Sequence, residues 1–216
     1  MRVAEEYASQ YTDHYLITAD EQTNGRGRKG NDWKSPNGGL WLTLGMHHIS
    51  TQKTFTLYIG YCVLKVLNEI FYPAEFQIKW PNDIYLKNHK VCGLICSQYP
   101  QYHKTLVGIG LNTNQDTDEY QTIKSILKKE IPNKTYQDTI LNQIFSHLTN
   151  YEKEGISLFR AYYEKYDFLK NKYLNIKIGE RQLSGQYAGI CDDGGLVLDT
   201  TEEKQETVYA GTVELG

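Results

Sequence analysis

The 216-residue sequence has only four cysteines and no long hydrophobic stretch. The cysteines are irregularly spaced and form no Cys/His set with zinc-finger spacing, which predicts reduced thiols in a cytoplasmic protein. No run reaches the roughly 18 apolar residues of a membrane helix, and the polar N-terminus lacks a signal-peptide pattern. We therefore expect a globular protein without a membrane partner.

A basic excess is also missing. The sequence carries 23 Lys+Arg against 26 Asp+Glu, a formal charge of −3. Proteins that mainly bind nucleic-acid phosphates usually show a strong basic excess, so this balance argues against DNA as a partner. The 40% hydrophobic and 23% charged fractions are typical of a soluble globular protein. At about 150 residues per domain, the length predicts one full domain and a small remainder.

The hydrophobic pattern predicts an α/β core with a mixed sheet over residues 1–170, and a small SH3-like β-barrel domain over residues 171–216. In the second part only short β-like runs occur, and residues 192–195 are a strong hairpin signal. Asp138 is a candidate N-cap for a helix over 138–154, and residues 87–90 predict a hairpin turn. The expected helices span 3–11, 54–71, 138–154 and 158–165, and the expected strands span 15–19, 40–46, 76–80, 84–86, 91–97, 105–110, 174–178, 183–190, 196–199 and 206–209.

Residues 24–39 form a long glycine-rich and basic segment without periodicity, which is typical of a functional or mobile loop. Within it, Gly25, Arg26, Gly27 and Arg28 alternate. Glycine lets a backbone approach a ligand closely, and arginine offers a planar donor fork for carboxylate or phosphate. A solvated basic loop or an Arg-Gly nucleic-acid segment explains the motif about equally well. Its position after a strand and near Trp33 favours a small-molecule anion site.

A second motif, Lys-Trp-Pro-Asn-Asp at 79–83, ends a predicted strand. Its Lys, Asn and Asp side chains suit a phosphate, a polar ligand edge and a metal ion, and the proline stiffens the turn. The alternative is a strand-ending turn with a surface charge pair, which is the better explanation for Asp83 taken alone.

Two further signals follow along the chain. Lys90 enters an apolar strand, where in isolation an edge-strand charge is the more common explanation. Gly108 and Gly110 lie inside a strand, which indicates the close approach of a ligand or, equally, a bulge.

Taken together, the order and spacing of these motifs resemble the biotin–protein ligases. The resemblance runs over residues 1–170, and the C-terminal segment with Gly211-Thr-Val resembles the small SH3-like domain of that family. It implies a class II synthetase-like core, a short form without an N-terminal DNA-binding domain, and a two-step reaction. Biotin and Mg-ATP would give biotinyl-5′-AMP, and the biotinyl group would pass to a lysine of a biotin carboxyl carrier domain of the acetyl-CoA carboxylase type. The resemblance is also compatible with a homodimer.

The resemblance also implies site residues. Lys90, Arg26 and Arg28 would be catalytic, with Lys90 at the biotin carboxylate and the arginines closing over carboxylate and phosphates. The biotin site would comprise Gln22, Gly25, Arg26, Gly27, Arg28, Lys90, Gly93, Ile95, Gly108 and Gly110. The ATP site would comprise Arg26, Arg28, Trp33, Lys79, Asn82, Asp83 and Asn112, with Asp83 also meeting Mg²⁺.

The sequence departs from the family pattern in places. A Ser-Thr pair is usual just before the first helix, but here Met1 aligns with the residue after it. We therefore expect either a start assigned too late or a biotin pocket open on one side. Ser97 stands where a glutamate is common, and Asn31 stands where a basic residue is common. The alternatives are a lipoate or octanoate ligase, whose Arg-Arg-x-Ser-Gly-Gly-Gly loop is missing, and a non-catalytic biotin- or adenylate-binding protein.

Overall fold

The computed structural model describes residues 2–47, 49, 52–200 and 204–216. Met1, on which the expected departure at the biotin site partly rests, lies outside the described residues. The core is a six-stranded sheet in the order β1-β2-β6-β5-β4-β3. Its strands are β1 (Tyr15–Ala19), β2 (Leu40–His47), β3 (Phe76–Lys79), β4 (Asp83–Leu86), β5 (His89–Tyr99) and β6 (Lys104–Leu111).

The five strand pairs of this sheet are all antiparallel. A parallel bridge joins Ile78 of β3 to Asp167 at the sheet edge. The sheet is therefore more uniformly antiparallel than the mixed sheet we expected, because short hairpins connect most of its neighbouring strands. Lys87 and Asn88 both adopt positive φ between β4 and β5, as a two-residue hairpin turn requires, and confirm the turn expected there.

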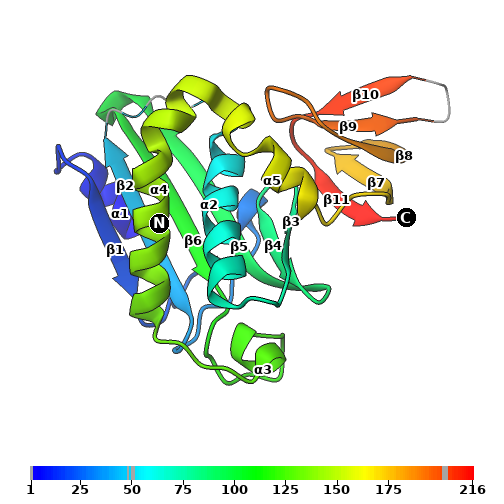
Figure 1. Ribbon diagram of the computed structural model, residues 1–216. Helices are drawn as coiled ribbons and strands as arrows, with labels where there is room; N and C mark the ends of the chain where they lie inside the picture. Colours follow the sequence, from blue (N-terminus) through cyan, green and yellow to red (C-terminus); the bar gives the residue numbers. More distant parts are fainter. Residues whose placement is uncertain (1, 48, 50–51, 201–203) are drawn as a thin grey trace.

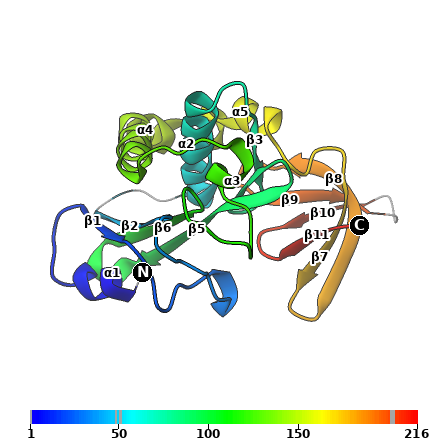
Figure 2. The same cartoon turned by 90° about the horizontal axis from the view of Figure 1, so that it is seen from below.

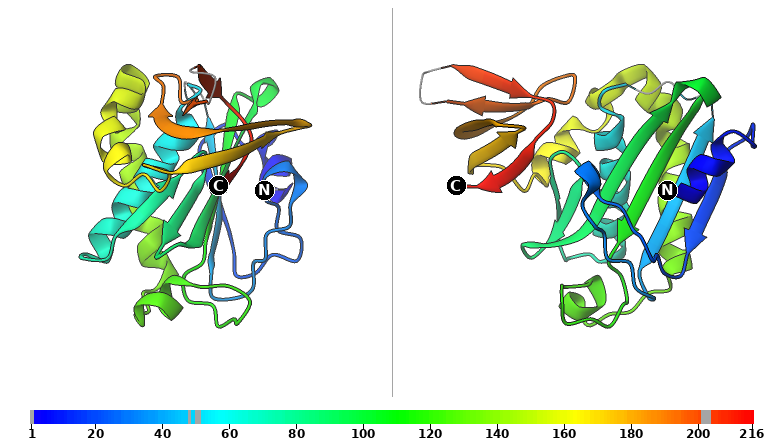
Figure 3. Two further views of the ribbon diagram at one scale, coloured as in Figure 1. Left: turned by 90° about the vertical axis from the view of Figure 1, so that its right-hand side faces the viewer. Right: turned by 180° about the vertical axis from the view of Figure 1, so that it is seen from behind.

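Helices cover one face of the sheet, and the other face stays largely open (Figures 1 and 2). The covering helices are α2 (Phe55–Ile70), α4 (Asn133–Glu154) and α5 (Arg160–Lys165). On the opposite face, α1 (Arg2–Ala8) packs on β2 and β6, and the segment between β1 and β2 crosses the sheet (Figure 3). Among the described residues, no helix combines the length and apolar character needed to cross a membrane.

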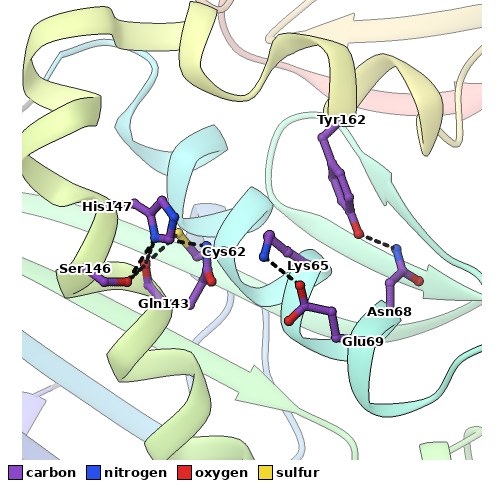
Figure 4. Close-up of polar contacts among 8 residues, drawn as sticks. All are labelled: Cys62, Lys65, Asn68, Glu69, Gln143, Ser146, His147 and Tyr162. Atoms are coloured by element: carbon purple, nitrogen blue, oxygen red, sulfur yellow. Dashed lines mark hydrogen bonds and ion pairs between the residues drawn. The ribbon is translucent and has the colours of Figure 1, made fainter.

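Polar contacts on the helical face position the start of β3 (Figure 4). The side-chain oxygen of Asn68 accepts from the backbone N–H of Phe76 at 2.7 Å, and its amide group donates to the Phe76 carbonyl at 3.4 Å and to the Tyr162 hydroxyl at 3.3 Å. Asn68 is buried, so these bonds also satisfy its polar group. The strand that carries the 79–83 motif is thereby tied to α2 and α5.

Two elements differ from expectation in the middle of the chain. Helix α4 begins at Asn133, after Pro132, whose ring fixes a φ suited to a helix start. Asp138 is therefore not an N-cap; it lies inside the helix and pairs with Lys134 at the i,i+4 spacing. The short helix α3 (Ile123–Leu127) was not expected, although Thr122 and Ser125 form a capping box at its start.

The C-terminal part is a second antiparallel sheet in the order β10-β9-β8-β7-β11. No pairing between the edge strands β10 and β11 occurs among the described residues, so barrel closure is not detected. The strand β11 was not expected, because only Val213 of its four residues is buried. The strands are β7 (Tyr173–Ile178), β8 (Arg181–Ile190), β9 (Leu196–Asp199), β10 (Gln205–Val208) and β11 (Thr212–Leu215). The boundary at residues 170 and 171 stays a prediction.

The hairpin turn between β8 and β9 docks this sheet onto the core. The Trp80 indole N–H donates to the Gly194 carbonyl at 2.9 Å. Arg160 of α5 donates to the Ile190 carbonyl at 2.9 Å and forms an ion pair with Asp192 at 2.6 Å. The expected turn at 192–195 is thus confirmed, and it places the second sheet next to the 79–83 motif.

A buried carboxylate lies at the same junction and predicts a pH-dependent stability. Asp167 accepts hydrogen bonds from the Tyr187 hydroxyl and the Leu169 backbone N–H, and burial raises its pKa to about 6. A raised pKa in the folded state means that its contribution to stability is complete below about pH 4 and lost as the pH rises to about 6. From pH 4 to pH 7, the free energy of unfolding of the parent should fall by about 2 kcal/mol relative to Asp167→Asn. Urea unfolding across this range measures the difference, and a constant difference would contradict the prediction.

Candidate active site

A cavity of about 740 Å³ lies on the open face of the large sheet. Its floor comes from β1, β2, β5 and β6, and its roof comes from the segment between β1 and β2. The 79–83 motif and the start of β11 close one end. The cavity thus brings together segments from both sheets, and all four sequence motifs contribute to it.

The glycine-arginine segment is a paired structure. Isolated bridges join Gln22 to Ser35 and Arg26 to Asp32, and the backbone N–H of Trp33 donates to the Gly25 carbonyl at 3.0 Å. The pairing leads to a one-turn 3-10 tip at Arg28–Gly30. We call residues 22–35 the Gly-Arg hairpin.

Gly25 serves the hairpin itself. A Cβ at this position would lie 2.2 Å from the Trp33 carbonyl oxygen, so a larger residue would push the two legs apart. Gly25 faces a second cavity, of about 660 Å³, between the hairpin and residues 116–120, and does not line the first. Gly25 therefore does not face the cavity in which we expected it to contact biotin.

Trp33 covers the glycine wall of the cavity. A Cβ at Gly110 would lie 2.7 Å from the indole nitrogen, and one at Gly93 would lie 3.1 Å from the indole ring. We expected Trp33 at the adenine end, but the structure places it against two glycines expected to bind biotin. Its indole N–H is buried without a hydrogen-bond partner among the described residues.

Lys90 and Asp83 form an ion pair inside the cavity. The Lys90 ammonium lies 2.8 Å from Asp83 Oδ1 and 5.2 Å from the centre of the Trp33 ring. The side chains are 37% and 20% exposed, so the pair is partly desolvated but open to a ligand. The β4–β5 hairpin brings the two motifs together, since Asp83 lies opposite Gly93 in the register.

Arg28 connects the hairpin tip to the 79–83 motif. Its guanidinium donates to the Asn82 side-chain oxygen at 3.0 Å, while the Asn82 amide donates to the Leu94 carbonyl at 2.6 Å. Burial lowers the pKa of Arg28, and the nearby Asp83 carboxylate opposes this effect. An arginine remains charged under such a shift, so Arg28 adds a cation at the end of the cavity formed by the 79–83 motif.

The second sheet supplies a wall that sequence reasoning did not place at the site. The Lys79 ammonium donates to the Val213 carbonyl at 2.9 Å, and the Lys29 ammonium donates to the Thr212 hydroxyl at 3.3 Å. Burial lowers the pKa of Lys79, and Lys90 acts in the same direction, whereas Asp83 raises it. The motif Gly211-Thr-Val was the available signal, but only tertiary contact brings it next to Lys79.

Most of the expected site residues line the cavity. Asn112 does not: it is 6% exposed, and its side-chain oxygen accepts from the Gln115 amide at 3.1 Å. Trp41 and Thr43 of β2 line the cavity but were not expected, because alternate strand positions become cavity floor only through the sheet register. The expected residues that line the cavity are Gln22, Arg26, Gly27, Arg28, Trp33, Lys79, Asn82, Asp83, Lys90, Gly93, Ile95, Gly108 and Gly110.

This chain is similar to known proteins over nearly its whole length. The "Bifunctional ligase/repressor BirA" of Bacillus subtilis is 28% identical over an alignment of 216 positions, which covers 93% of this chain and 66% of that protein. The protein of the same name from Escherichia coli is 26% identical and is covered to 60%. The chain thus spans less than two thirds of the length of these relatives.

Among solved structures, the biotin protein ligase of Aquifex aeolicus in complex with biotin and ATP has a TM-score of 0.86 and 27% identity. That match covers 98% of this chain and 93% of the other. The model of the biotin protein ligase C terminal domain matches residues 174–216, and the model of the biotin/lipoate A/B protein ligase family matches residues 2–114. The family model thus matches more than half of the sequence, and the chain belongs to the biotin/lipoate A/B protein ligase family.

Proposed function

We propose that this chain is a biotin–protein ligase. In the first step a carboxylate oxygen of biotin attacks the α-phosphorus of ATP, which gives biotinyl-5′-AMP and pyrophosphate. In the second step the ε-amine of a carrier lysine attacks the biotinyl carbonyl carbon, which gives the amide, AMP and a proton. The observation that carries this proposal is the convergence of Lys90, Arg28 and Lys79 on one cavity beside the glycine wall.

The charges suit the first step. A carboxylate and a triphosphate repel one another, so cations placed in a partly water-excluded cavity lower the barrier. Lys90 lies nearest the wall formed by Gly93, Gly110 and Trp33, and we assign it to the biotin carboxylate. Arg28 and Lys79 lie toward the nucleotide end.

Mg²⁺ belongs to the proposal as a companion of ATP. No group of three or more His, Cys, Asp or Glu side chains suited to a metal occurs among the described residues. Mg²⁺ bound with phosphates often uses only one or two carboxylates, and Asp83 Oδ1 is buried with no hydrogen bond beyond its ion pair with Lys90. Asp83 fits this single-carboxylate role, and the ion would neutralise phosphate charge.

The roof of the cavity suits the handling of a reactive intermediate. A mixed anhydride hydrolyses readily, so excluding water from the closed site protects it. The Gly-Arg hairpin lies over the cavity, and Arg28 ties its tip to Asn82. We assign Arg26 and Gly27 to this roof as well, because both line the cavity.

We propose a biotin carboxyl carrier domain as the acceptor. Support comes from the "Biotin--[acetyl-CoA-carboxylase] ligase" of Mycobacterium tuberculosis, which is 28% identical over 114 residues. A cytoplasmic location is part of the same proposal, since ATP and reduced thiols belong to that compartment. Formation of a homodimer stays a prediction, as does the absence of a DNA partner.

Biotin-dependent ATP–pyrophosphate exchange tests the proposed function. We expect exchange with biotin and none with lipoate or octanoate. Exchange driven by lipoate or octanoate alone would identify the alternative ligase. Biotin binding measured by calorimetry without any exchange would instead identify a non-catalytic binding protein.

A further inference from the structure

Asn133, at the start of α4, lies outside the cavity, yet it ties together the two segments that flank it. Its amide group donates to the Gly38 carbonyl at 3.1 Å and to the Gly39 carbonyl at 2.9 Å. Its side-chain oxygen accepts from the Thr113 hydroxyl at 2.7 Å. One side chain thus joins the exit of the Gly-Arg hairpin to the segment that follows β6.

The Gly38 carbonyl is the centre of this cluster. Besides Asn133, the Thr113 hydroxyl lies 2.9 Å from it and the Asn114 backbone N–H lies 3.2 Å from it. The single Thr113 proton can serve Gly38 or Asn133 at one time, so the three groups act as a unit. Thr113 is fully buried, and a buried polar group of this kind is costly to leave unpaired.

At Gly38 the two segments are in close main-chain contact. Gly38 has a φ of +100°, and a Cβ there would lie 2.9 Å from the Gln115 Cα. The two segments therefore touch through their main chains, and the side chains of Thr113 and Asn133 hold them in one register. Since Gly38 and Gly39 lie between the hairpin and β2, which begins at Leu40, their position sets where the second leg of the hairpin, with Trp33, returns to the sheet.

We propose that Asn133 is a positioning residue of the ligase reaction. Through Gly38 and Gly39 it holds the second leg of the Gly-Arg hairpin, so that Trp33 stays on the glycine wall and Arg28 reaches Asn82. The inference rests on the proposed function and adds to it a residue that touches neither the cavity nor its motifs. A displacement of about 1 Å caused by a distant substitution can change catalysis by about a hundredfold.

Asn133→Asp gives the sharpest test, because it separates positioning from a role in the helix. Aspartate near a helix N-terminus is favoured, so a purely helical role predicts unchanged or improved behaviour. Our inference predicts the opposite, since a carboxylate has no donor for the Gly38 and Gly39 carbonyls. We expect Asn133→Asp to release preformed biotinyl-adenylate about tenfold to a hundredfold faster and to raise the KM for biotin, with kcat near that of the parent.

Three further variants test the same inference. Thr113→Val, which keeps the shape but loses the hydroxyl, should show the same shift, and Thr113→Ser should restore the parent behaviour. Asn142→Asp, on an exposed position of the same helix, should behave like the parent. If Asn133→Asp fails to fold, the comparison of Thr113→Val with Thr113→Ser tests the inference. None of these substitutions changes the groups of the hydrogen bond that the Trp41 indole N–H donates to the Pro36 carbonyl at 3.0 Å, so we expect the segment to keep one anchor.

Limited trypsin digestion provides a readout that needs no activity. The Gly-Arg hairpin contains Arg26, Arg28, Lys29 and Lys34 as cleavage sites, and we expect faster cleavage there in Asn133→Asp and Thr113→Val. Parent-like cleavage and adenylate retention in both variants would overturn the inference. A parent without exchange, but with the expected pattern of cleavage, would overturn only the proposed function.

Discussion

Replacing Lys90 with alanine is expected to lower biotin-dependent ATP–pyrophosphate exchange by about a thousandfold. In the proposed reaction the biotin carboxylate must come into contact with the α-phosphate, and the Lys90 ammonium lies beside the glycine wall. Because the cavity is partly closed, water compensates poorly for the loss of one positive charge. Exchange rates of the purified variant and the parent measure the effect.

Uncharged biotinamide distinguishes a role in charge from a role in packing. Affinity for biotin should fall in Lys90→Ala, whereas affinity for biotinamide should stay near that of the parent. Lys90→Met, which keeps most of the length of the side chain, should resemble Lys90→Ala. Lys177→Ala, at an exposed position of β7, serves as the control. Equal losses for biotin and biotinamide would contradict the assignment of Lys90 to the carboxylate.

Replacing Arg28 with glycine should let biotinyl-adenylate escape about a hundredfold faster, while the first step survives. The Arg28 guanidinium bonds to Asn82 and so fastens the hairpin tip to the 79–83 motif. Without this bond the roof opens more often, and the adenylate meets water and free amines. Measurement of released biotinyl-adenylate during turnover, together with exchange, separates escape from a loss of the first step.

The partner of Arg28 provides a second route to the same outcome. Asn82→Ala removes the acceptor but leaves the arginine in place, so it should also speed the release of the adenylate. Arg181→Gly, at an exposed position of β8, should leave release unchanged. Retention of the adenylate in Arg28→Gly, as tight as in the parent, would show that the tip contact does not hold the roof closed.

Local patterns predicted much of the architecture. The run 54–71 is rich in apolar helix formers and became α2, most of whose side chains are buried. Short alternating runs became strands near the expected residues, and the turn at Lys87 and Asn88 contained an asparagine, which tolerates the positive φ found there. Such features depend on neighbours within a few residues. Helix α3 has only five residues, too few for a helical period to repeat, and β11 buries only Val213 of its four residues.

The family motifs predicted most of the cavity, but not its internal order. Trp33 follows the Gly-Arg motif closely, yet the pairing of the hairpin returns it to Gly93 and Gly110. Asn112 ends a motif, yet it turns toward Gln115 and away from the cavity. The spacing of motifs in the sequence does not specify where these two side chains point, because that depends on how the hairpin legs and the strands pair.

By itself, then, the sequence determined most of the strands, the main helices and most of the charged groups that share a cavity, since local preferences and motif spacing decide these. Tertiary structure alone decided that Lys90 pairs with Asp83, that Lys79 bonds to Val213 of β11 at one end of the cavity, and that Asn133 bonds to Gly38. The members of the last two pairs lie 134 and 95 residues apart along the chain, and even Lys90 and Asp83 meet only across a hairpin. Such contacts arise only when buried polar groups must find partners in a packed fold, and that requirement has no local signature.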